Sequence, residues 1–220
     1  GLKRAPVSVL QRVSAIPGVE NVEARVAAPA NLELAGYGQP ISGLMIGLPR
    51  GAPHFNLLHL HAGRMPDPGK DREALVSDGF AKAHKLQPGF SLQVTINGRR
   101  RSFSIVGIAS TPEFIYQLAP GSIVPDFKTY CVLWMNAETL EGAYNMTGAF
   151  NQVAATLQRG ARVEDAITAL DQILRPYGGL GAHGRKDQVS HRFLTEEFKQ
   201  LTILSTLFPA IFLSVAAFLL

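Results

Sequence analysis

The sequence predicts an α+β fold in which two ferredoxin-like βα halves flank an inserted β-rich subdomain and a transmembrane helix follows. Three observations carry this prediction. The last twenty residues, 201–220, contain no charged side chain. Two helical stripes, at 7–16 and 163–174, each stop at a proline followed closely by a glycine. Between them, residues 90–108 show the alternating pattern of a β-hairpin.

The C-terminal run has the length and composition of a membrane span. At about 1.5 Å per helical residue it extends roughly 30 Å, the thickness of a bilayer's hydrocarbon core. Its Leu, Ile, Val and Phe side chains favour insertion by about 4 to 7 kcal/mol in total. A buried core helix is the alternative, but such a helix usually shows a polar stripe, and this run has only scattered hydroxyls. We expect these residues to be embedded in membrane lipid: Leu201, Ile203, Leu204, Leu207, Phe208, Ile211, Phe212, Leu213, Val215, Phe218, Leu219 and Leu220.

Residues 1–200 have the composition of a water-soluble region, large enough for one or two domains. Hydrophobic residues make up 46% and charged residues 17% of the chain, which is typical of globular proteins. The net charge of +4 is small, and the only basic run, 99–101, has no aromatic residues interleaved, so we expect no nucleic-acid partner. The single Cys131 excludes an internal disulfide and leaves the compartment open.

The N-terminal sequence, GLKRAPVSVL, lacks the pattern of a signal peptide. We therefore expect that export of this domain would need an upstream transmembrane helix. Basic residues at 185, 186, 192 and 199 precede the apolar run. Because the positive-inside rule applies to short loops, they do not decide the side of the membrane.

A helix over 5–17 and strands at 19–27 and 43–48 are expected at the N-terminal end. Pro6 suits a first helical position, and Pro17-Gly18 ends the helix. Short strands and turns follow, with a strand at 73–76, a brief helix from Ser77 or Asp78 to Leu86, and the hairpin. Asn97-Gly98 is its turn, because both central positions of a type I′ turn need positive φ.

The second half contains expected strands at 130–135 and 151–157 and helices at 137–144 and 163–174. The last of these would pack beside the N-terminal helix on one face of a shared sheet. Ser190 or Thr195 can begin a helix that continues into the apolar run without a Gly or Pro break before Phe208. We expect 1–55 and 128–190 to form one α+β subdomain, 56–127 the inserted β-rich subdomain, and 191–220 the linking and transmembrane helix.

No pattern of catalytic residues stands out. Residues 179–184 match GxGxxG but follow a helix and not a strand, so a flexible glycine loop is the simpler interpretation. His59 and His61 would share one face of a strand, yet no third ligand has a suitable spacing for zinc. Cys131 lies in an apolar strand, where a thiol is usually buried and inert. We expect no catalytic residue, no metal site and no bound cofactor.

The segment 114–126, within the long loop at 112–128, is the best candidate for a partner surface. It carries Phe114, Ile115 and Tyr116, and apolar residues in a long loop either pack against the core or meet another molecule. Packing against the core is the more common outcome, and the sequence leaves both open.

Several segments together resemble the extracytoplasmic domain of FtsX-like ABC transporter permeases, the MacB-like periplasmic core domain. The most specific are Gly63-Arg64-Met65-Pro66, then EALVS at 73–77, then Pro88-Gly89, in this order and spacing. Similar stretches are LKRAP at 2–6, IPGVENVEARV at 16–26, INGRRRSFSIVGIASTPEFIY at 96–116, PGSIVPDFKTYCVLWM at 120–135 and YGGLGAHGRKDQVSHRFLTEEFKQL at 177–201. The resemblance covers nearly the whole chain and includes no catalytic motif.

The resemblance implies a porter-type α+β part with an inserted β-rich part, lying between the first and second transmembrane helices of a permease. Leu201–Leu220 would be most or all of the second helix, and the first helix and a first strand would precede Gly1. It implies a cytoplasmic ABC-type ATPase that binds the ATP, a second permease copy or half, and a non-catalytic role for this chain. Residues 1–200 would lie on the periplasmic or extracellular side of a bacterial inner membrane, where a periplasmic partner or substrate would meet them.

We therefore expect an extracytoplasmic permease domain that couples ATPase-driven movement of transmembrane helices to export or extraction of a substrate. An extracytoplasmic sensor domain of a membrane signalling receptor is the alternative, since it too is flanked by membrane helices. A membrane-anchored hydrolase is a third possibility and would need a role for His59, His61 or Cys131. The sequence does not identify the substrate.

Overall fold

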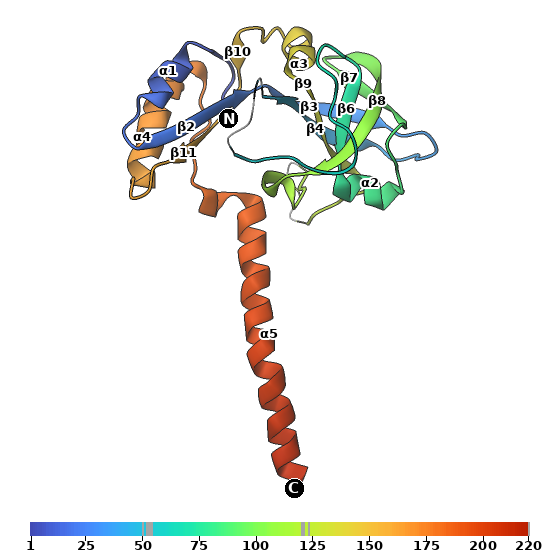
Figure 1. The fold of residues 1–220 in the computed structure, drawn as a ribbon, viewed down its shortest axis with the longest axis vertical. Helices are drawn as coiled ribbons and strands as arrows, with labels where there is room; N and C mark the ends of the chain where they lie inside the picture. The colour runs from blue at the N-terminus through green and yellow to red at the C-terminus, as the bar shows by residue number, and fades with distance from the viewer. Residues whose placement is uncertain (50, 52–54, 120–121, 123, 220) are drawn as a thin grey trace. The chain divides into compact units, whose positions relative to one another are not determined.

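The structure, a computed structural model, describes residues 1–49, 51, 55–119, 122 and 124–219. Within them the fold is α+β (Figure 1). The chain divides into two units, Gly1–Ala182 and His183–Leu220. All the strands of the described residues lie in the first unit, and the second carries the long apolar helix α5 (Val189–Leu219). The expected α+β class with an apolar C-terminal helix is confirmed.

A closed ring of six strands is the largest element of the first unit. Its order is β8-β6-β9-β4-β3-β7, and β7 pairs again with β8. Closure depends on the length of β8, whose first half pairs with β7 and whose second half pairs with β6. The short strand β5 (His59–Gly63) adds to β8. The ring strands are β3 (Ala27–Glu33), β4 (Ile41–Leu48), β6 (Glu73–Ser77), β7 (Ser91–Ile96), β8 (Arg99–Ser110) and β9 (Tyr130–Asn136).

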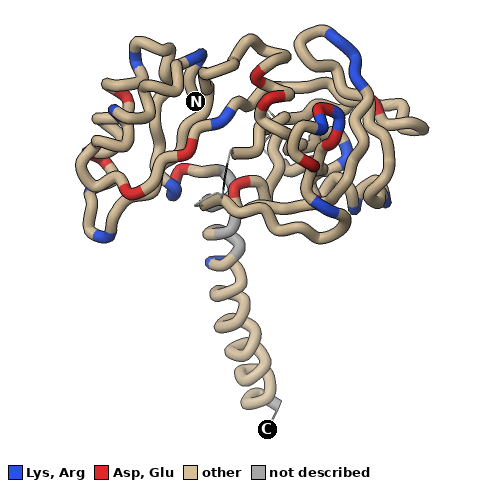
Figure 2. The backbone as a smooth tube through the Cα atoms, turned by 45° about the horizontal axis from the view of Figure 1, so that its top comes forward, with Lys and Arg blue, Asp and Glu red and all other residues tan. Residues whose placement is uncertain are grey.

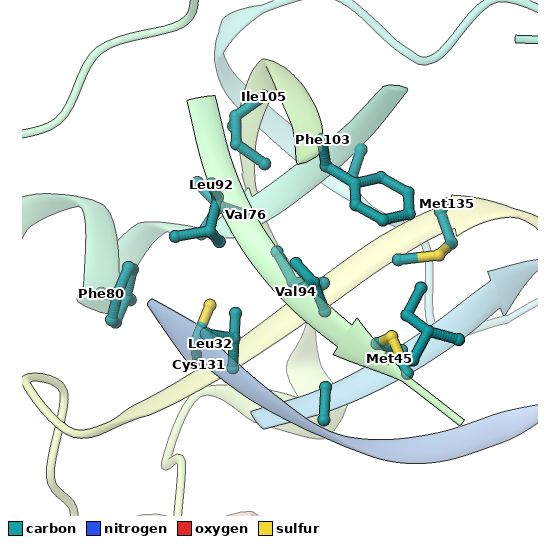
Figure 3. Close-up of a cluster of buried hydrophobic side chains, with 14 of the residues drawn as sticks. Leu32, Met45, Val76, Phe80, Leu92, Val94, Phe103, Ile105, Cys131 and Met135 are labelled. Atoms are coloured by element: carbon teal, nitrogen blue, oxygen red, sulfur yellow. The ribbon is translucent and has the colours of Figure 1, made fainter. Parts of the chain in front are cut away.

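The barrel encloses the main hydrophobic core, because alternate residues of each strand point inward. On β9, Cys131, Leu133 and Met135 belong to the inner cluster, while Val132 and Trp134 belong to a second cluster on the outer face. Figure 3 shows inner side chains from all six ring strands converging, together with Phe80. Inward-facing apolar residues on every strand explain why this stretch closes into a ring.

Two short helices cover the ends of the barrel. Helix α2 (Asp78–His84) directly follows β6, and α3 (Ala137–Ala143) directly follows β9. Since β6 and β9 are antiparallel neighbours, the two helices lie at opposite ends (Figure 1). Phe80 of α2 and Leu140 of α3 are fully buried in the inner cluster. Helix α2 ends as predicted before Pro88, with Lys85 in a left-handed conformation.

The rest of the first unit is a smaller α/β part. Helices α1 (Val9–Ser14) and α4 (Val163–Leu174) share one hydrophobic cluster with β2 (Val19–Arg25) and β11 (Gln152–Leu157). Strands β2 and β11 pair antiparallel, and β1 (Ala5–Pro6) pairs separately with β10 (Ala149–Phe150). The ferredoxin-like description stays a prediction, because these strands form two separate two-stranded ladders.

Most predicted elements are confirmed, with several differences. The strand expected at 19–27 is instead β2 followed by β3, which reaches Glu33, and β1 and β10 were not expected. The predicted first helical position is wrong: Pro6 pairs with Ala149 in β1, and the helix begins at Val9. Strand β5 was not predicted, because HLHAG has few residues with high β-propensity. The barrel strands come from 27–48 and 130–136 as well as from 59–110. The domain boundaries 1–55, 56–127 and 128–190 therefore stay a prediction.

Candidate functional site

Helix α5 exposes the residues predicted to contact lipid. Residues Phe198–Phe218 are long and apolar enough to cross a membrane, with a mean hydropathy of 2.1 and no part buried. The predicted large apolar side chains from Leu201 to Phe218 are 41–90% exposed. Figure 2 shows charged residues across the first unit and almost none along this helix. Leu219 ends the helix, and Leu220 lies outside the described residues.

The hydroxyl groups of this segment are bonded within the helix. Thr202 donates to the Phe198 carbonyl at 2.8 Å, and Thr206 donates to the Thr202 carbonyl at 2.9 Å. Ser214 donates to the Ala210 carbonyl at 2.7 Å. An unbonded hydroxyl in hydrocarbon is costly, so these contacts make the segment compatible with lipid. Pro209 lies inside the continuous helix.

The three residues of the predicted partner surface on the loop 112–128 differ in how far they are buried. Its first turn, η1 (Pro112–Phe114), places Phe114 against Trp134, with ring centroids 6.2 Å apart. Phe114 therefore packs against the outer barrel cluster. Ile115 is 43% exposed, and Tyr116 is half-buried. Packing against the core is therefore observed for Phe114, while a partner surface at Ile115 and Tyr116 stays a prediction.

Glu113 ties the start of this loop to the α/β part. Its carboxylate forms a short ion pair with Arg25 at the end of β2. The Arg25 Nε donates to Gln152 Oε1 at 2.9 Å, and its guanidinium carbon lies 6.0 Å from the centroid of the Phe114 ring. The Arg25 and Glu113 side chains are only 23% and 20% exposed. Solvent therefore screens this pair less than a surface pair.

Two further contacts hold the middle and the end of the loop. The Ser77 hydroxyl donates to Gln117 Oε1 at 2.9 Å, and both residues are buried. The Asp126 carboxylate accepts from the Thr129 hydroxyl and from the Lys128 and Thr129 amides. These hydrogen bonds, with the Thr129 hydroxyl first, lower the pKa of Asp126. Among the described residues of this loop, the contacts of Glu113, Gln117 and Asp126 therefore fix three positions.

Among the described residues, the reactive side chains that the sequence singled out lie on different strands, Cys131 on β9 and His59 and His61 on β5. Cys131 is fully buried, and burial raises the pKa of its thiol. The His59 and His61 rings lie 4.8 Å apart, and His61 Nε2 is 2.8 Å from the Ser110 hydroxyl. Among the residues that the structure describes, no group of three or more His, Cys, Asp or Glu could hold a metal ion.

The glycines at 179–184 also lack the setting of a dinucleotide site. They follow the turn η2 (Arg175–Tyr177), and only the three-residue turn η3 (Arg185–Asp187) comes next. A dinucleotide motif requires a strand before it and a helix opening after it.

Sequence reasoning missed the Arg25–Glu113 pair. Asn21, Glu23 and Arg25 alternate along β2 and indicate one polar face. Which residues meet that face depends on the register with β11 and on the path of a distant loop, and neither is a local signal.

No family model matches the chain, and no curated protein matches its sequence. Solved structures are similar to this chain. The extracellular domain of the noncanonic ABC-type transporter YknZ from Gram-positive bacteria has a TM-score of 0.50 at 12% identity, covering 82% of this chain and 88% of that chain. The periplasmic region of MacB from Actinobacillus actinomycetemcomitans has a TM-score of 0.45 at 13% identity, covering 78% of this chain and 73% of that chain.

At this identity the likeness to the YknZ domain shows the fold. It confirms the expected resemblance, in fold, to the extracytoplasmic domains of ABC transporter permeases.

Proposed function

We propose that this chain is the extracytoplasmic domain and one membrane helix of an ABC transporter permease subunit. It couples ATPase-driven movement of the transmembrane helices to export or extraction of a substrate. The observation that carries this proposal is the fold shared with the extracellular domain of YknZ over most of both chains. The apolar helix α5, fully exposed along its span, supports it.

The proposed partners follow from this role. A cytoplasmic ABC-type ATPase hydrolyses the ATP, so we assign no catalytic residue to this chain. A second permease copy or half completes the membrane part, and lipid surrounds the exposed apolar residues of α5. Residues 1–200 lie on the periplasmic or extracellular side. There the exposed side chain of Ile115, with the half-buried Tyr116 beside it, is available to a periplasmic partner or substrate.

The proposed organisation is a porter-type, ferredoxin-like part made of 1–55 and 128–190, with 56–127 inserted. The continuous helix α5 supports a mechanical link, because no break interrupts it between Val189 and Leu219. A rigid helix transmits displacement along its axis, whereas a flexible linker does not.

The first test is purification of the full-length gene product from detergent-solubilised membranes, with mass spectrometry of the proteins that accompany it. We expect a stoichiometric ABC-type ATPase. A histidine kinase or response regulator in its place, or no ATPase under gentle conditions, would overturn the permease proposal in favour of the sensor alternative.

The second test inserts Gly-Gly-Gly after Lys199. Each helix-interior glycine costs about 1 kcal/mol relative to alanine, so the insertion makes α5 flexible at this point. We expect ATPase activity to become uncoupled from transport. The same insertion after Gly38, an exposed loop position where an added Cβ would meet nothing within 4 Å, is the control and leaves coupling intact. Unchanged coupling in the α5 variant would exclude the mechanical link.

A further inference from the structure

The barrel and the α/β part of the first unit are joined at two chain crossings. At the first, β2 continues into β3 with only Val26 between them. At the second, the chain leaves α3, passes 144–148 and enters β10 and β11. Two such crossings allow one part to rotate against the other unless further contacts hold them.

The side-chain amide of Asn151, between β10 and β11, spans these crossings. Its Oδ1 accepts from the Ala27 amide at 2.8 Å, and its Nδ2 donates to the Ala27 carbonyl at 2.7 Å. Its backbone amide also donates to the Arg25 carbonyl at 3.3 Å. The side chain therefore bonds the first residue of a barrel strand as a neighbouring strand would. The two bonds have opposite polarity, so only an amide in this orientation makes both.

Arg25 makes the second set of contacts across the junction. It lies on β2, in the α/β part, and bonds Gln152 of the same part. Its guanidinium also pairs with Glu113 and lies near the Phe114 ring, both on the barrel side. Glu113 Oε2 in turn accepts from the side-chain Nδ2 of Asn56 at 3.5 Å. One half-buried side chain thus connects β2 to two loops of the barrel.

The position of a hinge follows from what holds Val26. Its side chain is 2% exposed within the inner barrel cluster, and its carbonyl accepts from the Gly47 amide at 2.9 Å. Val26 therefore belongs mechanically to the barrel. At the first crossing, the backbone between Arg25 and Val26 would therefore accommodate a rotation of the α/β part, next to both sets of contacts.

We propose that Asn151 and the Arg25–Glu113 pair form a two-part lock that fixes the orientation of the α/β part relative to the barrel. With the lock closed, the two parts move as one body. With both contacts removed, each part keeps its own hydrophobic cluster and the junction at Arg25–Val26 becomes a hinge. Asn151 and Arg25 are positioning residues in this arrangement.

The test measures the distance between the two parts in the full chain in lipid nanodiscs. Spin labels are placed by Gln172→Cys on α4 and Gln87→Cys after α2, both exposed. The native Cys131 is fully buried and does not take the label. Pulsed electron paramagnetic resonance then gives the distance distribution. We expect one narrow distribution for the parent and at least a twofold wider one for Asn151→Ala with Arg25→Gln.

The control is Arg100→Gln, which removes an ion pair with Glu33. Both of these residues belong to barrel strands, so this ion pair does not cross the junction. This variant should leave the distribution narrow. If the double variant does not fold, Asn151→Asp with Glu113→Gln answers the same question, since the introduced carboxylate keeps the acceptor for the Ala27 amide and loses the donor. A distribution as narrow as the parent's, in a variant with a native circular dichroism spectrum, would overturn the lock.

Discussion

The barrel and the α/β part bury apolar side chains in different ways. In the barrel, a closed ring leaves every strand with two neighbours, and its large inner side chains are almost fully buried. In the α/β part, the ladder of β2 and β11 has two strands, and most of their residues are only half-buried. A closed ring removes sheet edges, whereas a two-stranded ladder depends on its helices for stability.

This difference indicates that the two parts have unequal local stability. The barrel core is formed by many mutually packed strands, so its opening requires near-global unfolding. The α/β cluster rests on α1, α4 and one face of a short ladder. We therefore expect the α/β part to unfold before the barrel. The junction contacts at Arg25 and Asn151 partly couple its unfolding to that of the barrel.

The largest expected effect comes from Phe103→Ala in the barrel core. Phe103 is fully buried, and truncation of a core phenylalanine costs about 3–5 kcal/mol. Trp134 is the only tryptophan and lies in the barrel, so its fluorescence reports barrel unfolding in urea, while circular dichroism reports both parts. We expect Phe103→Ala to shift both signals together to lower urea.

The matched variant is Phe150→Ala in the α/β cluster, where Phe150 is 2% exposed. We expect circular dichroism to fall at lower urea than the Trp134 signal, because the α/β part unfolds first. If the circular dichroism and Trp134 curves of Phe150→Ala coincided, the two parts would unfold as one unit. The inferred difference in their stability would then be wrong.

A smaller effect is expected from Gln117→Ala, which tests whether the loop 112–128 belongs energetically to the barrel. The change leaves the buried Ser77 hydroxyl without its acceptor, and such a loss costs about 1–3 kcal/mol. We expect the Trp134 unfolding curve in urea to shift accordingly. Val124→Ala, which shortens an exposed side chain of the same loop, is the control and should leave it unchanged. If Gln117→Ala left the Trp134 unfolding curve unchanged, the loop would not contribute to the stability of the barrel.

The sequence predicted those elements whose signals are local. The turn at Asn97-Gly98 has φ of 46° and 75°, as the two residue types indicate. Helix α4 begins and ends where its apolar stripe does. Closure of the ring was not predicted, because it depends on pairs far apart in the chain, such as Asn31 with Thr95. Pro6 satisfied a helix-start pattern, but an edge strand tolerates proline equally well.

The same distinction holds for the candidate site. The apolar composition of 201–220 is visible in any reading of the sequence, and the exposed span of α5 agrees with it. The division of Phe114 and Ile115 between the core and solvent could not be predicted, since it depends on where Trp134 lies in the folded barrel. The contacts of Arg25 depend on strand register in the same way.

The smallest expected effect on stability comes from a charged contact, the ion pair of Arg64 with Glu73. Arg64 donates to both carboxylate oxygens of Glu73 at 2.8 and 2.7 Å, and the Asp67 amide donates to the same carboxylate. The Arg64 hydrogen bonds, followed by the Asp67 amide, lower the pKa of Glu73 to about 2. Because the folded pKa lies below the usual value of 4.5, the stabilisation is complete above pH 4.5 and is lost as the pH falls toward 2.

We expect Glu73→Gln to lower the melting temperature by about 2 °C at pH 7 and by progressively less between pH 4.5 and 2. Glu20→Gln removes an exposed carboxylate from β2, in the α/β part, and is the control. Its melting temperature should follow that of the parent at every pH. If instead the difference between parent and Glu73→Gln stayed constant down to pH 2, the Arg64–Glu73 contact would not stabilise the barrel through charge. The loop 64–72 would then be held by other contacts, such as the hydrogen bonds that the Asn136 side-chain Nδ2 donates to the Asp67 and Lys70 carbonyls.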